Sequence, residues 1–535
     1  MKTDERTRAC PLCGTSTSAS EMAEVDWLTP DVLDRLASDN PSWRSEDGAC
    51  PACVQHALLC TLLDRGEAAL HDGLQSIWPI DPGAAFGAMP TPLRLHADPR
   101  FTGRGVTLAV VDVGFYPHPD LTQPHNRIRA WVDAGRDPVV ERRLAPSDVP
   151  HWPGWNERQP AQWHGLMTSA VAAGNGWLSH GLYRGLASEA DLVLVQVRDR
   201  AGHITNHTIT RALNWLSQQA DALGIRVINL SVAGEPVSPL KGNLVDEAVT
   251  RLVDQGITVI AAAGNDGRRR LIPPATAPAA LTIGGLDDKN TFDHKEVELW
   301  HSNYDEAVNG ALKPELVAPS LWVIAPVLPG SDVALEAEQL FAQRGHGRIH
   351  VEERLAELKM VTPHYRHVDG TSFAAPIVAS VVACMLQAMP SLTPDQIRHL
   401  LIKTAQFIPG ASLERQGAGA VNAGPAVTQA LAAPHHQRFT QTRWPQVTST
   451  EVTFQLYDNE AHSVQIIGSW NGWQVPGLAA VEIKRGLWQA HLPGLEAGTY
   501  AYKFLLDGER WLTDPANPTR IPDHFGGWNS VLQCL

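Results

Sequence analysis

The sequence predicts an α/β protein whose mostly parallel sheet is covered by helices on both faces, with a small module on either side. Between residues 80 and 433, apolar runs typical of buried strands alternate with helical patterns, which is the order that parallel sheets require. Two Cys-x-x-Cys pairs lie near the N-terminus. After residue 448 the pattern changes to short alternating strands, which predicts an all-β sandwich.

Composition excludes several classes of protein. Apolar residues make up 44% of the 535 residues and charged residues 19%, so large cores can form and wholesale disorder is excluded. A net charge of −14 argues against a nucleic-acid partner, which would need a basic surface. The first residues lack the apolar run of a secretory signal, and we find no apolar stretch of about 18 residues to span a membrane. We expect a cytoplasmic protein with no membrane partner.

Residues 1–75 are predicted to form a metal-binding module. The chain has seven cysteines, and an odd count without a leader argues against a disulfide framework. Cys10, Cys13, Cys50 and Cys53 form two pairs separated by 36 residues. Four thiolates suit a closed structural Zn²⁺ site, here in a treble-clef-like layout. The alternatives are a redox Cys-x-x-Cys or free thiols. Cys60 and Cys384 occupy apolar positions that indicate a core.

Residues 76–433 carry the predicted α/β domain. Its buried strands are expected at 106–112, 191–197, 226–231 and 257–263. Helices are expected at 164–173, 206–223 and 243–255. Residues 434–447 are polar and lack periodicity, so we interpret them as a linker, and residues 448–535 form the predicted β-sandwich.

Two residues of this domain suit general-base chemistry. Asp112 follows a buried apolar strand, and catalytic groups of open α/β sheets gather at such strand ends. His164 begins a helix rich in small residues, which can pack closely beside a cleft. Each residue alone has an ordinary structural explanation, as a turn Asp or a surface His.

Two further residues suit acyl transfer. Ser372 lies in Gly-Thr-Ser-Phe-Ala-Ala-Pro and begins a helix, so its N–H and the helix dipole face developing negative charge. The alternative role, a helix cap, explains less of this long pattern. Asn265 lies in Ala-Ala-Gly-Asn just past a buried strand, where its amide can donate to an oxyanion.

These four segments, in the order Asp, His, Asn, Ser, resemble the signature blocks of the subtilisin-like serine proteases. His-Pro-Asp-Leu at 118–121 and Lys-Pro-Glu-Leu-Val-Ala-Pro at 313–319 resemble accompanying blocks. The resemblance covers about 350 residues and implies a subtilisin-like fold. It implies that Ser372 is the nucleophile, His164 the base and Asp112 the group that orients it.

The resemblance also implies a substrate-lining strand. Ser231, Val232, Ala233 and Gly234 would pair with a peptide by strand addition and form one wall of the specificity pocket. Ala233 stands where the family often has Gly, and a methyl there narrows the pocket. Val113 replaces the Ser or Thr that usually follows the catalytic Asp, and Leu166 replaces the Thr that usually lies two places after the His. Neither change removes a catalytic group.

A longer departure lies between Pro326 and Val361, where two helix-forming segments enlarge an interval that the family usually crosses in fewer residues. The insertion either shapes the cleft or is a surface decoration. No segment resembles the family's propeptide. Family members often bind calcium, for which we assign no ligands.

The C-terminal module resembles the glycogen-binding modules of the AMP-activated kinase β-subunit. The segments on which this resemblance rests include Gly-Ser-Trp-Asn-Gly-Trp at 468–473 and Tyr-Ala-Tyr-Lys-Phe at 500–504. By motif position, Trp473 and Trp511 would stack on sugar rings, while Lys503 and Asn529 would bond hydroxyls. Many relatives use this fold only to pack against a partner domain, which stays an alternative.

The sequence therefore predicts a serine endopeptidase that cleaves protein or peptide substrates through an acyl-enzyme intermediate. The alternative is a silent or signal-gated subtilisin-like scaffold that binds a glucan or a protein partner.

Overall fold

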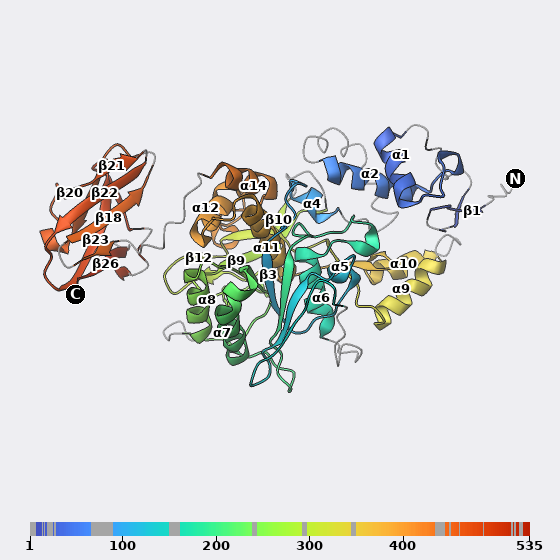
Figure 1. Cartoon of the computed structure of the whole chain (residues 1–535), viewed down its shortest axis with the longest axis horizontal. Helices are drawn as coiled ribbons and strands as arrows, with labels where there is room; N and C mark the ends of the chain where they lie inside the picture. Colours follow the sequence, from blue (N-terminus) through green and yellow to red (C-terminus); the bar gives the residue numbers. More distant parts are fainter. Residues whose placement is uncertain are drawn as a thin grey trace. The chain divides into compact units, whose positions relative to one another are not determined.

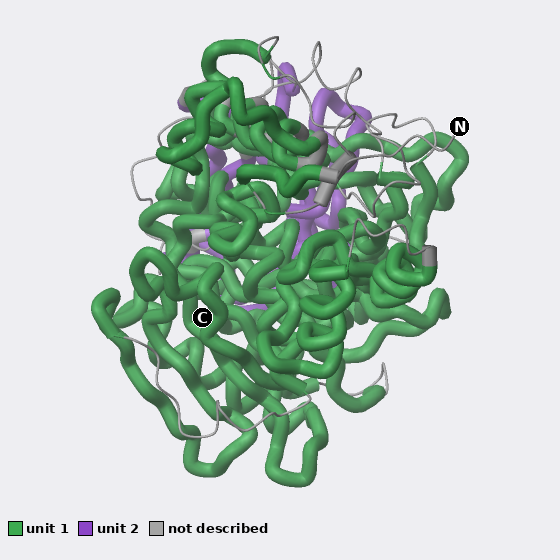
Figure 2. Tube along the Cα trace, turned by 90° about the vertical axis from the view of Figure 1, so that its right-hand side faces the viewer, with its two compact units in different colours: residues 1–434 green, residues 435–535 purple. Residues whose placement is uncertain are grey.

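The structure, a computed structural model, divides into two compact units, residues 1–434 and 435–535 (Figure 2). The residues that it describes are 7–12, 14, 16–18, 25, 28–65, 89–148, 161–237, 243–290, 297–343, 349–433, 445–448, 451–458, 461–484, 486–514, 517, 520–523 and 528–534.

A nine-stranded sheet forms the centre of the first unit. Its order is β10-β9-β8-β7-β3-β6-β4-β5, with β13 also paired to β9. The pairing is parallel except at the edges, where β5 and β10 run antiparallel. The strands are β3 (Thr107–Asp112), β4 (Ile128–Asp133), β5 (Val140–Arg143), β6 (Asp191–Gln196), β7 (Ile225–Leu230), β8 (Thr258–Ala262), β9 (Leu281–Asp287), β10 (Glu298–Leu299) and β13 (Leu316–Pro319). The predicted α/β class is confirmed, and the four predicted strands lie within one residue of their expected bounds.

Helices cover both faces of this sheet (Figure 1). On one face α11 (Thr371–Ala388) packs with α6 (Gln162–Ala173) and α14 (Ala423–Ala432). On the other face lie α7 (Asn206–Leu223) and α8 (Leu244–Asp254). Because parallel strands are buried on both sides, β3 is buried at every residue, which explains its continuous apolar sequence.

Helix α11 corrects one sequence interpretation. Its 18 residues have a mean hydropathy of 1.6, so by length and composition alone it meets the criteria for a membrane span that we did not find in the sequence. In the structure 83% of that window is buried, and α11 is the central helix of the core. Its small residues let it pack closely against the sheet.

The insertion after Pro326 forms its own small layer. β14 (Val323–Pro326) pairs with β16 (Tyr365–Val368), which pairs with β15 (Met360–Thr362). Between β14 and β15 lie α9 (Asp332–Gln343) and α10 (Ile349–Glu357), which are the two helices that the sequence predicts. They share a separate apolar cluster with Val327 and Met360.

The cysteine-rich segment folds around α1 (Pro30–Asp39) and α2 (Pro51–Arg65). Its core includes Leu36, Trp43 and Val54. The remaining short elements of the first unit are β1 (Thr7–Ala9), β2 (Ser16–Ser18), η1 (Ser45–Asp47), α4 (Thr91–Arg94), α5 (Pro119–Thr122), η2 (Trp177–Ser179), β11 (Asp305–Glu306), β12 (Leu312–Lys313), α12 (Pro394–Thr404) and α13 (Leu413–Gln416).

The second unit is all-β, as predicted. One sheet has the order β17-β18-β22-β21, and the other has the order β20-β19-β23-β26-β25 with β24 on β23. Phe454, Trp488, Tyr502 and Phe504 form the core between them. The elements are β17 (Gln446–Val447), β18 (Glu451–Tyr457), β19 (Val464–Gly468), η4 (Ser469–Asn471), β20 (Leu478–Ala479), β21 (Val481–Lys484), β22 (Leu487–Pro493), β23 (Gly498–Leu506), β24 (Arg510–Leu512), β25 (Arg520–Pro522) and β26 (Trp528–Cys534).

Candidate active site

Asp112 is the last residue of β3, and its carboxylate is fully buried. Three donors satisfy it. Oδ1 accepts from His164 Nδ1 at 2.7 Å and from the Val113 N–H at 2.7 Å, while Oδ2 accepts from the Thr168 hydroxyl at 2.7 Å. The carboxylate is therefore fixed in one orientation, which in turn fixes the imidazole ring.

His164 lies in the first turn of α6, two residues after the helix begins. Its neighbour must be glycine, because a Cβ on Gly165 would lie 2.0 Å from the Gly114 carbonyl oxygen. This close approach holds α6 against the turn that follows β3. Since Nδ1 donates to Asp112, Nε2 is left as the acceptor. The side chain is 19% exposed, so Nε2 can reach a substrate.

Opposing effects act on the pKa of His164. Burial lowers it, whereas the negative charge of Asp112 and the hydrogen bond to it raise it, and the net result is a pKa above the ordinary 6.5. The imidazolium formed during proton transfer is thus stabilised in place.

Ser372 is the second residue of α11, so its backbone N–H is one of the free donors at a helix start. Gly370 precedes the helix with φ of 129°, a conformation that favours glycine. The rings of His164 and Phe373 lie 5.8 Å apart, which places the starts of α6 and α11 side by side. The Ser372 hydroxyl has no hydrogen-bond partner among the described residues, and such nucleophile–base bonds are often long before substrate binds.

Asn265 lies three residues after the end of β8, beside the start of α11. Its Oδ1 accepts from the Thr371 N–H at 3.0 Å and from the Thr371 hydroxyl at 2.8 Å. That oxygen is therefore occupied, and Nδ2 is the remaining group. A Cβ on Gly370 would lie 3.3 Å from Nδ2, so a larger residue would crowd the amide. Asn265 is therefore held at the start of α11, where Ser372 is the second residue, and Nδ2 is the donor that it can offer there.

The predicted substrate-lining residues Ser231, Val232, Ala233 and Gly234 follow β7. The Ser231 hydroxyl donates to the Ser372 carbonyl oxygen at 2.9 Å, and the Gly234 N–H donates to the Pro273 carbonyl oxygen at 2.9 Å. Ala233 is the exposed member of this segment. The segment therefore lies against the start of α11, which Asn265 also contacts.

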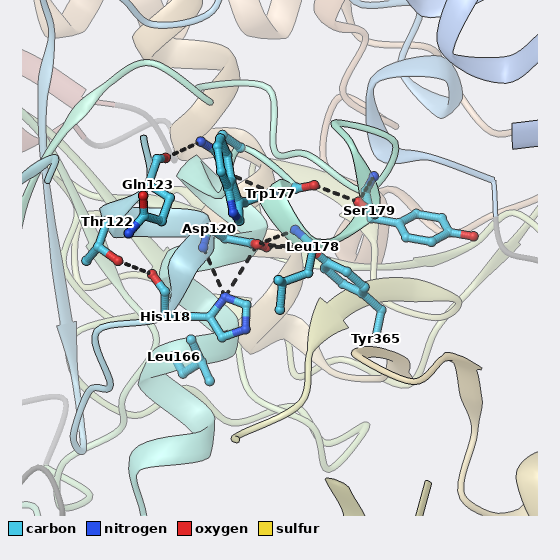
Figure 3. A network of polar contacts seen from close by, with 12 residues as sticks. His118, Asp120, Thr122, Gln123, Leu166, Trp177, Leu178, Ser179 and Tyr365 are labelled. Atoms are coloured by element: carbon cyan, nitrogen blue, oxygen red, sulfur yellow. Dashed lines mark hydrogen bonds and ion pairs between the residues drawn. The ribbon is translucent and has the colours of Figure 1, made fainter. Parts of the chain in front are cut away.

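A polar network beside α6 was not apparent in the sequence (Figure 3). The Tyr365 hydroxyl donates to the buried Asp120 carboxylate, 2.9 Å from each oxygen. The Asp120 N–H donates to His118 Nδ1 at 3.1 Å. These contacts tie β16 to α5 across 245 residues of sequence, and no local spacing signals such a partner. Nearby, His56 Nε2 of α2 bonds the Ser179 carbonyl oxygen at 2.8 Å.

Three of the predicted metal ligands lie together. The sulfurs of Cys10, Cys50 and Cys53 lie within 4.8 Å of one another, and the Cys50 N–H donates to Cys10 Sγ at 3.4 Å. The Cys10 and Cys53 sulfurs are 4.0 Å apart, close to the roughly 3.8 Å that two ligands about 2.3 Å from a tetrahedral Zn²⁺ would show. Cys13 lies outside the described residues. The cluster fits a metal ion.

The predicted carbohydrate-binding residues share one face of the second unit. The Trp473 and Trp511 rings lie 6.5 Å apart and both are exposed. Tyr502 and Ser530 pair across β23 and β26 and are buried. Their strand neighbours Lys503 and Asn529 therefore lie on the outer face. Trp511 pairs with Leu505, so it lies on that face too. Lys503 forms an ion pair with Asp523.

Comparison with known families agrees with this geometry. Residues 103–419, more than half of the chain, match the model of the subtilase family. The chain therefore belongs to the subtilase family. Residues 450–534 match a second model, described as the glycogen recognition site of AMP-activated protein kinase.

Curated relatives are named as proteases. The serine protease AprX of Bacillus subtilis is 30% identical over 332 residues, which are 60% of this chain and 66% of AprX. A probable subtilase-type serine protease of Deinococcus radiodurans is 28% identical over 59% of this chain and 39% of its own length. Subtilisin Savinase of Lederbergia lenta is 27% identical over 60% of this chain and 90% of its own. The chain thus matches less than two thirds of the length of AprX and of the Deinococcus protein.

Proposed function

We propose that this chain is a serine endopeptidase that cleaves peptide bonds through an acyl-enzyme on Ser372. The observation that carries the proposal is the 2.7 Å hydrogen bond between His164 Nδ1 and buried Asp112, at the helix start that adjoins Ser372. The bond fixes the tautomer in which Nε2 can accept a proton.

Each group then has a defined role. Ser372 Oγ attacks the scissile carbonyl carbon while His164 Nε2 takes the hydroxyl proton. The Ser372 N–H and Asn265 Nδ2 donate to the oxyanion of the tetrahedral intermediate. His164 then gives its proton to the leaving amine, and the carbon–nitrogen bond breaks. Water, deprotonated by His164, hydrolyses the resulting ester. Asp112 stays a carboxylate and stabilises the imidazolium.

The substrate on the acyl side is proposed to pair with Ser231–Gly234. Main-chain hydrogen bonds would add the peptide as a strand, and the exposed Ala233 methyl would restrict the neighbouring pocket. The hydrogen bond from Ser231 to the Ser372 carbonyl oxygen supports this placement because it anchors the segment beside the nucleophile.

Digestion of a denatured protein tests the activity. The full-length chain and its Ser372→Ala variant are incubated with unfolded casein, and new termini are identified by mass spectrometry. The proposal expects internal cleavages by the wild type only. A wild type that leaves casein intact would favour the silent or gated scaffold instead.

We also propose that Trp473, Trp511, Lys503 and Asn529 bind an α-glucan. The two exposed indoles on one sheet face support this, because aromatic rings stack on the apolar faces of sugars. Binding of the full-length chain to glycogen tests it. Trp511→Ala is expected to weaken binding, whereas Ile483→Ala, which removes an exposed residue of β21, is expected not to. Equal binding by both variants would mean that the glucan binds elsewhere.

A second experiment tests whether the C-terminal module regulates the protease. Peptide hydrolysis measured with and without glycogen shows whether glucan binding changes the activity of the active site.

The cysteine cluster is proposed to hold a structural Zn²⁺, with Cys10, Cys50 and Cys53 as ligands and Cys13 as the fourth. A metal held by four thiolates has no open position, so it would stabilise the module that α2 anchors to the protease core through His56.

A further inference from the structure

A cavity of about 770 Å³ opens beside His164, outside the groups that the proposed mechanism uses. Most of its lining is apolar. The apolar and aromatic residues that line it include Trp163, Met167, Val327, Leu328, Val333 and Phe373. The cavity is large enough for an aromatic side chain.

The cavity lies on one definite side of the nucleophile. Trp163 and Met167 flank His164 on α6, and Phe373 follows Ser372 on α11. Ser231–Gly234 and Asn265 do not line it. Because His164 must protonate the leaving amine, the released part of the substrate has to pass on the His164 side. The cavity is therefore on the leaving-group side, opposite the acyl-side strand.

The far wall of the cavity comes from the insertion. Val327, Leu328 and Pro329 follow β14, and Val333 lies in the first turn of α9. This wall is held in place at two points. Tyr365 of β16 is hydrogen-bonded to buried Asp120 (Figure 3), and Lys359 forms an ion pair with Asp369. The insertion thus builds a pocket wall that is pinned to the protease core.

Lys and Arg side chains at the cavity are matched in number by carboxylates. Two cationic side chains, Lys359 and Arg366, line it together with two carboxylates, Asp332 and Asp369. Asp369 is paired with Lys359 and its charge also acts on Arg366. The formal charges of these four side chains cancel, so we expect the apolar walls to decide which side chain the pocket accepts.

We infer that this cavity is a specificity pocket for a bulky apolar side chain on the first residue of the leaving group, built in part by the insertion. The inference rests on the proposed serine-protease function. The insertion then takes part in substrate selection, and the occupant of the pocket is the substrate segment that departs from the acyl-enzyme.

Acyl transfer isolates this side of the site. The full-length chain is acylated by a peptide methyl ester, and amino-acid amides then compete with water for the acyl-enzyme. The amine nitrogen attacks the ester carbonyl, the bond to Ser372 Oγ breaks, and the amine proton passes through His164 to Ser372. The ratio of peptide product to hydrolysed acid measures binding of the amide in the leaving-group pocket.

The pocket is expected to prefer phenylalanine amide over alanine amide and glutamate amide, by about tenfold or more. Val333→Trp fills the cavity and should lower the phenylalanine-to-alanine ratio. Leu335→Trp is the matched control, because Leu335 is 41% exposed on the same helix and does not line the cavity. Its ratio should stay at the wild-type value.

Each outcome has a distinct meaning. Ester hydrolysis by Val333→Trp at the wild-type rate shows that the variant is folded, and Val333→Ala provides a second variant that should retain the phenylalanine preference. Three results would overturn the proposed pocket: a phenylalanine-to-alanine ratio near one in the wild type, a preference of the wild type for glutamate amide, or a phenylalanine-to-alanine ratio in Val333→Trp that equals that of the wild type. No ester hydrolysis by the wild type would instead overturn the proposed function.

Discussion

Asp112 and His164 depend on each other for their chemistry. The Asp112 charge, acting against burial, raises the pKa of His164 above 6.5. Since the base must be neutral, activity should rise with pH through an ionisation that lies above that ordinary value. Asp112→Asn removes the raising charge, so the acid limb of the kcat/KM profile should move to lower pH, with a loss of kcat of about 10⁴-fold. An acid limb that stays in place would mean that another group controls it.

Asn265 is the second residue whose role can be isolated. Its oxygen is occupied by Thr371, so the amide donor and the anchoring bond can be removed separately. Asn265→Leu should lower kcat by roughly 10²–10³ with little change in KM. Thr371→Val loosens the Asn265 amide but keeps its donor, so the decrease in kcat should be smaller than for Asn265→Leu. If the two variants lose activity equally, Asn265 acts through positioning and not as a donor.

At the level of single residues, the sequence pointed to the groups that we propose to do the chemistry, but not to the residues that hold them in place. Asp112, His164, Asn265 and Ser372 lie in motifs with specific neighbours, and they lie at the predicted strand ends and helix starts. Thr168 was missed, although it lies one helical turn after His164 and so shares its face. Thr371 was missed because the motif pointed to its neighbour.

Among the elements, the hairpin β15–β16 is joined to α5 by the hydrogen bond of the Tyr365 hydroxyl to the Asp120 carboxylate. Tyr365→Phe leaves the Asp120 carboxylate buried with one donor fewer, which should cost about 1–3 kcal/mol of unfolding free energy. Tyr183→Phe is the control, since its ring packs 5.4 Å from Tyr365 without a hydrogen bond to Asp120 in the described structure. Thermal unfolding of both variants tests this, and equal stability would show that the hydroxyl contributes little.

The elements were predictable from periodicity, whereas their neighbours were not. The strands 226–231 and 257–263 and the helices of the insertion could be found because apolar spacing is a local property. The strand order in which β3 lies between β6 and β7, and the pairing of β14 with β16 across the insertion, are set by contacts distant in sequence. For the same reason the sequence left open whether the insertion shapes the cleft.

For the molecule as a whole, the flanking module is expected to require its metal. Cys50→Ser should lose the bound Zn²⁺ measured by elemental analysis of the purified chain. Cys60→Ser should keep it, because Cys60 is buried near His56 and lies outside the cluster. Zinc retained by Cys50→Ser, or absent from the wild type, would contradict the proposed site.

The central claim is that Ser372 is an activated nucleophile, and covalent labelling tests it most directly. The full-length chain and Ser372→Ala are treated with a fluorophosphonate probe, and the modified peptide is located by mass spectrometry. We expect the wild type alone to be labelled, on Ser372. Wild-type protein that stays unlabelled, or that carries the label on a different residue, would contradict the account.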